Sequence, residues 1–134
     1  MGLDNGFVVK SNKRDITRAM LPEGIVYPFE DFSPTEVVYW RKNWGLRNKV
    51  MNHFGWRDSI NEWQFELETS NQVMDLIMII ASFLDPVKWE RDGDSIWDFD
   101  EIKNTLVQDI VNLALVKAFM ENNPDVYLEF YDSY

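Results

Sequence analysis

A segment that is apolar on nearly every side, residues 70–84, constrains the fold of this 134-residue chain more than any other feature. Thr69 and Gln72 have the spacing of a capping box, which predicts a helix start, and Asp85 followed by Pro86 predicts its end. Apolar residues occupy two faces of the predicted helix: Val73, Leu76, Ile77, Ile80 and Leu84 on one, and Met74, Met78, Ile79 and Phe83 on the other. Such a helix is buried on several sides, so we expect it at the centre of the domain or at a subunit interface.

Two further helices are predicted, one before and one after this segment. The sequence Ser33-Pro34-Thr35-Glu36 is typical of a helix start, and we expect that helix to run to about Phe54. Its apolar stripe consists of Val37, Trp40, Trp44, Met51 and Phe54. The other helix is expected from about 101 to 121, opened near Asp98 and ended before Pro124.

Alternating apolar and β-branched residues predict strands near both ends of the chain, at 6–10 and 126–134, and a further strand at 63–68. A turn signal also predicts a small hairpin between 87–90 and 95–99. These elements indicate an α+β domain in which about three main helices pack on a small sheet that includes the N- and C-terminal strands.

Residues 11–32 follow no helical or strand period and contain two Pro and one Gly. We therefore interpret them as an irregular loop or arm, with a second short strand near 25–27. The whole chain, 1–134, is expected to form one domain.

The composition excludes several classes of site. With no Cys and one His, the chain cannot carry a disulfide framework, a catalytic thiolate or a Cys-based zinc site. It contains no Gly-rich phosphate-binding loop, so the nucleotide enzymes that need one are excluded. No metal or cofactor is expected. The longest apolar run, 76–84, is shorter than the roughly 20 residues of a bilayer span, so we also expect no membrane helix.

The formal net charge of −10 is concentrated in the second half of the chain. Residues 68–134 contain four basic and fourteen acidic residues, whereas 1–67 contain nine of each. An acidic surface repels nucleic-acid phosphate, so we do not expect direct nucleic-acid binding. The same surface attracts positive charge, so we expect a protein partner with a basic surface. Simple solubility is the alternative explanation.

The densest acidic cluster is Asp92, Asp94, Asp98, Asp100 and Glu101. Its spacing does not match a Ca²⁺-binding loop, which needs Gly at position 6 and Glu at position 12. A turn followed by acidic residues at a helix N-terminus explains the cluster without a metal. These five residues are the predicted contact for a basic partner.

A second candidate site combines aromatic and guanidinium groups: Trp40, Arg41, Trp44, Arg47 and Asn48. Aromatic rings stack on planar groups, and arginines hold phosphate or carboxylate in two-point contacts, so these residues predict binding of a small anionic metabolite or nucleotide. The alternative is structural: the tryptophans belong to the core, and the arginines pair with acidic residues of the C-terminal half.

Four segments resemble a family of small phage- and prophage-encoded hypothetical proteins: 1–6 (MGLDNG), 36–42 (EVVYWRK) with 44–48 (WGLRN), 94–98 (DSIWD) and 130–134 (FYDSY). The resemblance implies a phage or mobile-element origin, and it implies that these segments converge in the fold. No catalytic residue follows from it. The start of the chain lacks a secretory signal, so the expected location is the cytoplasm, which is the host's if a phage encodes the protein.

Two functional hypotheses follow. The first is an acidic accessory protein that acts by protein–protein interaction, such as an inhibitor of a host basic or nucleic-acid-binding protein. The second is a binding module for a small anionic ligand at residues 40–48. Catalysis by Asp and Glu stays open as a third, and the chain is expected to be a monomer or a homodimer.

Overall fold

The computed structural model describes residues 4–30, 32–54, 65–92 and 98–133. Its elements follow one another as β1 (Asp4–Ser11), a 3₁₀ helix η1 (Arg18–Met20), β2 (Glu36–Arg41), α1 (Trp44–His53), β3 (Phe65–Leu67), α2 (Ser70–Ser82), α3 (Pro86–Asp92), α4 (Phe99–Asn122) and β4 (Val126–Ser133). Helices and one antiparallel sheet together confirm the predicted α+β class.

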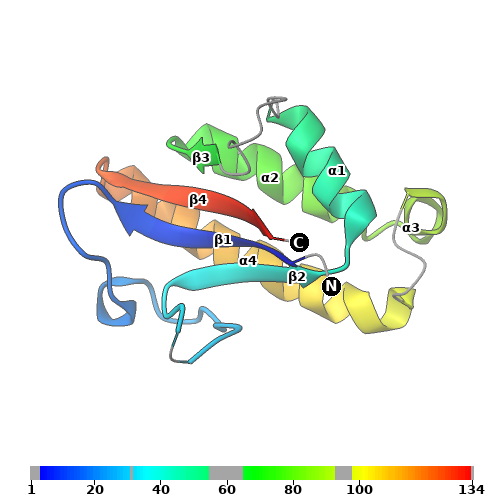
Figure 1. Cartoon of the computed structure of the whole chain (residues 1–134), viewed down its shortest axis with the longest axis horizontal. Helices are drawn as coiled ribbons and strands as arrows, with labels where there is room; N and C mark the ends of the chain where they lie inside the picture. Colours follow the sequence, from blue (N-terminus) through cyan, green and yellow to red (C-terminus); the bar gives the residue numbers. More distant parts are fainter. Residues whose placement is uncertain (1–3, 31, 55–64, 93–97, 134) are drawn as a thin grey trace.

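The four strands pair in the order β2-β1-β4-β3, with the two terminal strands in the middle of the sheet (Figure 1). Phe7 of β1 lies opposite Phe130 of β4 on one side and Val38 of β2 on the other. The N- and C-terminal strands therefore pair as predicted. The described parts of three segments that carry the phage-protein resemblance lie side by side, because Asp4 faces both Arg41 and Ser133.

The core lies between the sheet and the packed helices α2 and α4 (Figure 1). Both helices and the inner face of the sheet contribute side chains without exposed surface, among them Phe7, Val38, Leu76, Ile80, Leu106, Leu113, Leu128 and Phe130. The capping box at Thr69 opens α2 as predicted. One side of α2 nevertheless faces outward, since Met74 is 41% and Met78 is 64% exposed.

The predicted helix over 33–54 is wrong in its first half. Residues Glu36–Arg41 form the edge strand β2, and α1 begins only at Trp44, capped by Asn43. The pairing of this β-branched and aromatic segment with β1 outweighs the helix-start signal at Ser33, whose carbonyl accepts the Glu36 amide in a turn. Lys42, with φ of 54°, separates the strand from the helix.

The predicted hairpin near residue 90 is also wrong, because Pro86–Asp92 form α3. Asp85 starts this helix: its side chain accepts the Val87 amide and its carbonyl accepts the Trp89 amide. Burial of Trp89 against Phe83 holds α3 on the core. Most of the second predicted strand, 95–97, lies outside the described residues.

The remaining predictions differ in outcome. The strand at 63–68 is present as Phe65–Leu67, and residues 63 and 64 lie outside the described part. In the segment 11–32, Ser11 ends β1, and η1 is the only other regular element among the described residues 12–30 and 32; 25–27 form no strand. Within the described ranges, no helix is both long and apolar enough to cross a bilayer.

Candidate functional site

Asp109, in the middle of α4, is a buried carboxyl group on the core side of the helix, with 5% of its surface exposed. Its Oδ2 accepts a hydrogen bond from Nε1 of Trp40, at 2.9 Å. Trp40 is held in place by β2 and by an edge-to-face contact with Phe7. The hydrogen bond between Trp40 and Asp109 thus joins the sheet to α4, although the two residues are 69 positions apart in the sequence.

Burial raises the pKa of Asp109 from its ordinary value to about 8, and the hydrogen bond from Trp40 only partly opposes this shift. The charged form is disfavoured because the protein interior solvates it less well than water does. Asp109 is therefore mainly a neutral acid at pH 7. Strongly shifted carboxyl groups in cavities are typical of functional sites.

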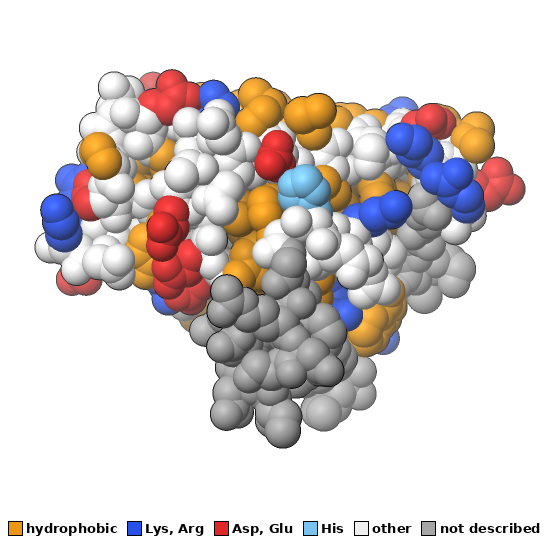
Figure 2. All heavy atoms as spheres, turned by 90° about the horizontal axis from the view of Figure 1, so that it is seen from above, with side chains coloured by type: hydrophobic (Ala, Val, Ile, Leu, Met, Phe, Trp, Pro, Cys, Tyr) orange, Lys and Arg blue, Asp and Glu red, His pale blue; other side chains and the backbone are white. Residues whose placement is uncertain are grey.

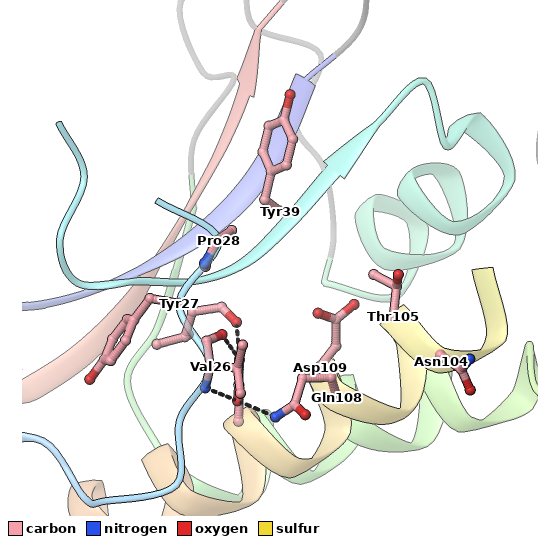
Figure 3. Close-up of a pocket in the computed structure, with 10 residues that line it drawn as sticks. Val26, Tyr27, Pro28, Tyr39, Asn104, Thr105, Gln108 and Asp109 are labelled. Atoms are coloured by element: carbon pink, nitrogen blue, oxygen red, sulfur yellow. Dashed lines mark hydrogen bonds between the residues drawn. The ribbon is translucent and has the colours of Figure 1, made fainter. Parts of the chain in front are cut away.

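A cavity of about 320 Å³ adjoins Asp109 at the outer edge of β2. Its walls come from the segment 26–28, from Val37 and Tyr39 of β2, and from one face of α4. Figure 3 shows the Asp109 carboxyl directed from α4 toward β2, with Thr105 one turn away along the helix.

Asn112 holds two of these walls together through four hydrogen bonds. Its Oδ1 accepts from the Val26 amide at 3.0 Å and from Nε2 of Gln108 at 2.9 Å. Its Nδ2 donates to the carbonyls of Val26 and Val37, at 2.8 and 2.9 Å. The cavity is therefore preformed, and Asn112 has no remaining hydrogen-bonding capacity for a ligand.

None of the described residues that line this cavity is Lys, Arg or His. The polar side chains along α4 are Asn104, Thr105, Gln108, Asp109 and Asn112. An anionic ligand would thus meet a carboxyl group and no counter-charge in the wall.

The five residues predicted to bind an anionic ligand do not gather in one site. Trp40 is buried and faces Asp109, while Arg41 lies at the exposed end of β2. Trp44, Arg47 and Asn48 lie on α1, where the guanidinium is 5.4 Å from the Trp44 ring and its Nη1 donates to Asn48. The segment 40–48 is therefore strand, turn and helix, and the single helix predicted there is wrong.

Arg47 instead makes a two-point ion pair with Asp132 of β4, at 2.6 and 3.1 Å. This confirms the structural alternative for Arg47, since its partner belongs to the C-terminal half. A second cavity of about 310 Å³ is bordered by Arg47, Asn48, Met51 and Asn52. Anion binding there stays a prediction, and the anion would compete with Asp132 for the guanidinium.

Three residues of the predicted acidic cluster, Asp98, Asp100 and Glu101, lie at the N-terminus of α4. Asp98 caps α4 by accepting the Asp100 amide, and Asp100 and Glu101 lie in the first turn. Asp92 is the last residue of α3, and Asp94 lies outside the described residues. The described part of the chain contains no group of His, Cys, Asp and Glu side chains that could hold a metal ion.

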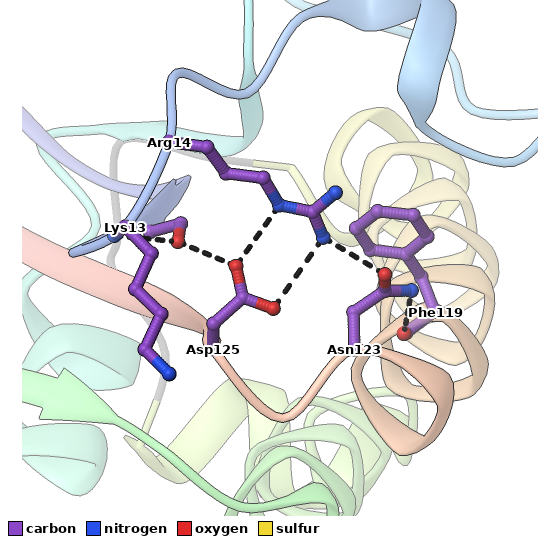
Figure 4. A network of polar contacts seen from close by, with 6 residues as sticks. Lys13, Arg14, Phe119, Asn123 and Asp125 are labelled. Carbon is purple, nitrogen blue, oxygen red and sulfur yellow. Dashed lines mark hydrogen bonds and ion pairs between the residues drawn. The ribbon is translucent and has the colours of Figure 1, made fainter.

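The acidic charge of the C-terminal half is partly neutralised in the fold. In β4 and just before it, Glu129 pairs with Lys10, Asp132 with Arg47, and Asp125 with Arg14, which also bonds Asn123 (Figure 4). Figure 2 shows acidic and basic side chains interspersed on the face it views. Because Asp109 is also protonated at neutral pH, the formal value of −10 overstates the negative charge.

The sequence reasoning missed Asp109, although a signal for it exists. Asp109 lies three residues after Leu106 and four before Leu113, so a helix puts all three on one face. A lone carboxyl in an apolar stripe costs free energy and indicates a special environment.

Comparison of the chain with protein-family models, with curated proteins and with solved structures found no match.

Proposed function

We propose that this protein is a binding module and that its ligand occupies the cavity beside Asp109. The observation that carries the proposal is Asp109, a residue that is 5% exposed, whose carboxyl group has a single hydrogen-bond donor among the described residues and lies in the wall of a preformed cavity. A purely structural acceptor for the Trp40 indole needs no ionisable group, because an amide oxygen accepts the same bond without the cost of burying an acid.

The dimensions of the cavity support this proposal. Its volume of about 320 Å³ is at the lower end of the range of small-molecule sites, which is about 300–1,000 Å³. A space of this size holds a small metabolite or one side chain of a larger partner. It also lies at the free edge of the sheet, between three separate chain segments, so a ligand contacts groups from each of them.

A fragment screen by two-dimensional NMR tests the proposal. We expect ligands to shift the backbone amide signals of 26–28 and of the α4 turn that contains Asp109. Thr105→Trp places a bulky side chain in the wall and should abolish binding, whereas Lys103→Trp, on the same helix but outside the wall, should leave it unchanged. Ligand shifts that persist in Thr105→Trp, or a screen without any shift at these positions, would refute the proposal.

A protein partner with a basic surface is the second candidate function, in line with a phage-type accessory protein or inhibitor. What supports it is the exposed acidic end of α4, where Asp98, Asp100 and Glu101 form no ion pair with a described residue. Affinity capture from a host lysate, followed by a salt titration, tests it. The double variant Asp100→Asn/Glu101→Gln should weaken capture, with Glu68→Gln as control, and capture that is indifferent to salt contradicts it.

A further inference from the structure

We infer that the group recognised in the Asp109 cavity is a cation, an ammonium or a guanidinium, that forms an ion pair with the Asp109 carboxylate. This inference rests on the proposed function, because it specifies the ligand of the same cavity.

The described wall offers hydrogen-bond acceptors without any positive charge. Gln108 uses one of its two amide N–H groups on Asn112, and its amide oxygen can accept a hydrogen bond, as can the Thr105 hydroxyl. Asn112 itself is fully engaged. A ligand that is rich in N–H donors therefore fits this wall better than an anion does.

Asp109 provides the charge that such a ligand needs. Trp40 engages Oδ2, while Oδ1 has no hydrogen-bond partner among the described residues. In Figure 3 the carboxyl points from α4 into the space below β2. A bound cation would supply both the missing donor and the counter-charge that an ionised buried carboxylate requires.

Cation binding has a measurable consequence for protonation. The pKa of Asp109 is about 8 in the unliganded protein, so at pH 7 the carboxyl carries a proton. A cation at the carboxylate favours the ionised form and lowers this pKa, so binding releases close to one proton at pH 7 and much less at pH 9. A neutral ligand that accepts the Asp109 proton in a hydrogen bond releases none.

The two other titratable side chains in the cavity wall are phenols, and both keep their protons in this range. From β2, Tyr39 has its pKa raised to about 12, mainly by burial, and its hydroxyl donates to Asp4. From the segment 26–28, the pKa of Tyr27 is also raised by burial, against the opposing effect of Arg18 stacked on its ring. Both phenols are neutral between pH 7 and 9, so Asp109 is the group that titrates.

The cation has two sources that share this chemistry: a free small amine, or a Lys or Arg side chain of a peptide. The net negative charge of the protein attracts either one. Probes that distinguish them are butylammonium and butylguanidinium ions, and the pentapeptides Gly-Gly-Lys-Gly-Gly and Gly-Gly-Arg-Gly-Gly with blocked ends.

The experiment follows the side-chain carboxyl ¹³C signal of Asp109 at pH 7 while each probe is added, with butyramide as the neutral probe of similar size. We expect the cations, but not butyramide, to move the signal to the ionised position. Asp109→Asn should weaken cation binding at least tenfold while keeping the fold, as seen in its amide spectrum, and Asp100→Asn should bind normally. Tighter binding of a pentapeptide than of the matching butyl ion identifies a protein side chain as the source.

Two results overturn the inference and separate it from the proposed function. If butyramide binds at the cavity as well as the cations do and the Asp109 signal stays protonated, the cavity is a ligand site but not a cation site. If neither these probes nor the fragment screen shifts the cavity residues, the proposed function fails with it.

Discussion

Gly6 of β1 leaves the space that the carboxylate of Glu36 on β2 occupies. A Cβ atom at Gly6 would lie 2.5 Å from Oε1 of Glu36 and 2.7 Å from Cε1 of Tyr131, which lies on β4, the other neighbour of β1. Glu36 is 1% exposed, and its carboxylate lies near the Tyr131 phenol, which lowers its pKa against the larger effect of burial. The packing in this part of the sheet therefore requires glycine at position 6, because the buried Glu36 side chain fills the space beside it.

We predict that Gly6→Ala destabilises the protein by about 1–3 kcal/mol, the usual cost of overpacking a well-packed site. Urea denaturation measures the change. In the background of Glu36→Ala the same substitution should cost less, because the closest contact, with Oε1 of Glu36, is gone. Equal costs in both backgrounds would show that Glu36 does not limit the space at Gly6.

We predict that stability decreases as the pH rises from about 4 to 8. Burial raises the pKa of Glu36 to about 7 and that of Asp109 to about 8. Hydrogen bonding lowers both values in part, through Tyr131 at Glu36 and through Trp40 at Asp109. The folded state thus retains protons that the unfolded chain has lost, and the free energy of unfolding falls with pH, by at most about 1.4 kcal/mol per pH unit for each group. Above about pH 8 the folded groups ionise too, and the decrease ends.

The variants Glu36→Gln and Asp109→Asn test this assignment, since each removes one titrating group without changing the side-chain shape. Each should flatten the dependence of the unfolding free energy on pH between 5 and 8. Asp100→Asn, at the exposed end of α4, should leave the slope as it is. A slope that survives in the double variant Glu36→Gln/Asp109→Asn would assign it to other groups.

Arg47 and Asp132 should show the energetics of a buried ion pair. The Asp132 side chain has no exposed surface and that of Arg47 has 10%. Arg47→Met leaves a buried, uncompensated carboxylate, so we expect a loss of about 3–5 kcal/mol in denaturant unfolding. Lys10→Met, which removes the exposed partner of Glu129, should cost about 0–1 kcal/mol. Adding Asp132→Asn to Arg47→Met should recover part of the loss, and no recovery would contradict the pairing.

Asn112→Ala should detach the segment 26–28 from α4. It removes both hydrogen bonds to Val26, the bond to the Val37 carbonyl and the bond from Gln108. We expect faster hydrogen exchange at the Val26 amide and weaker binding of any ligand in the Asp109 cavity. Asn122→Ala, which loses one exposed bond to Ala118, is the control. Unchanged exchange at Val26 in Asn112→Ala would show that other contacts hold this wall.

The helix starts, the terminal strands and the fold class could be predicted from the sequence, because local interactions determine them. The capping box of Thr69 and Gln72, the acidic start of α4 at Asp98 and the alternating strands at both ends of the chain are readable because their signals come from neighbours within a few residues. These signals were sufficient for the α+β class and for the pairing of the terminal strands.

The conformation of residues 36–41 and the position of the site depend on contacts between segments that are distant in the chain. The helix start predicted at Ser33 does not form, because residues 36–41 pair with β1 instead. The hydrogen bonds of that pairing and the burial of Val38 and Trp40 outweigh local helix propensity. The contact of Trp40 with Asp109, like that of Arg47 with Asp132, joins residues far apart in the chain. Such contacts depend on how sheet and helices pack, and no spacing between neighbouring residues encodes them.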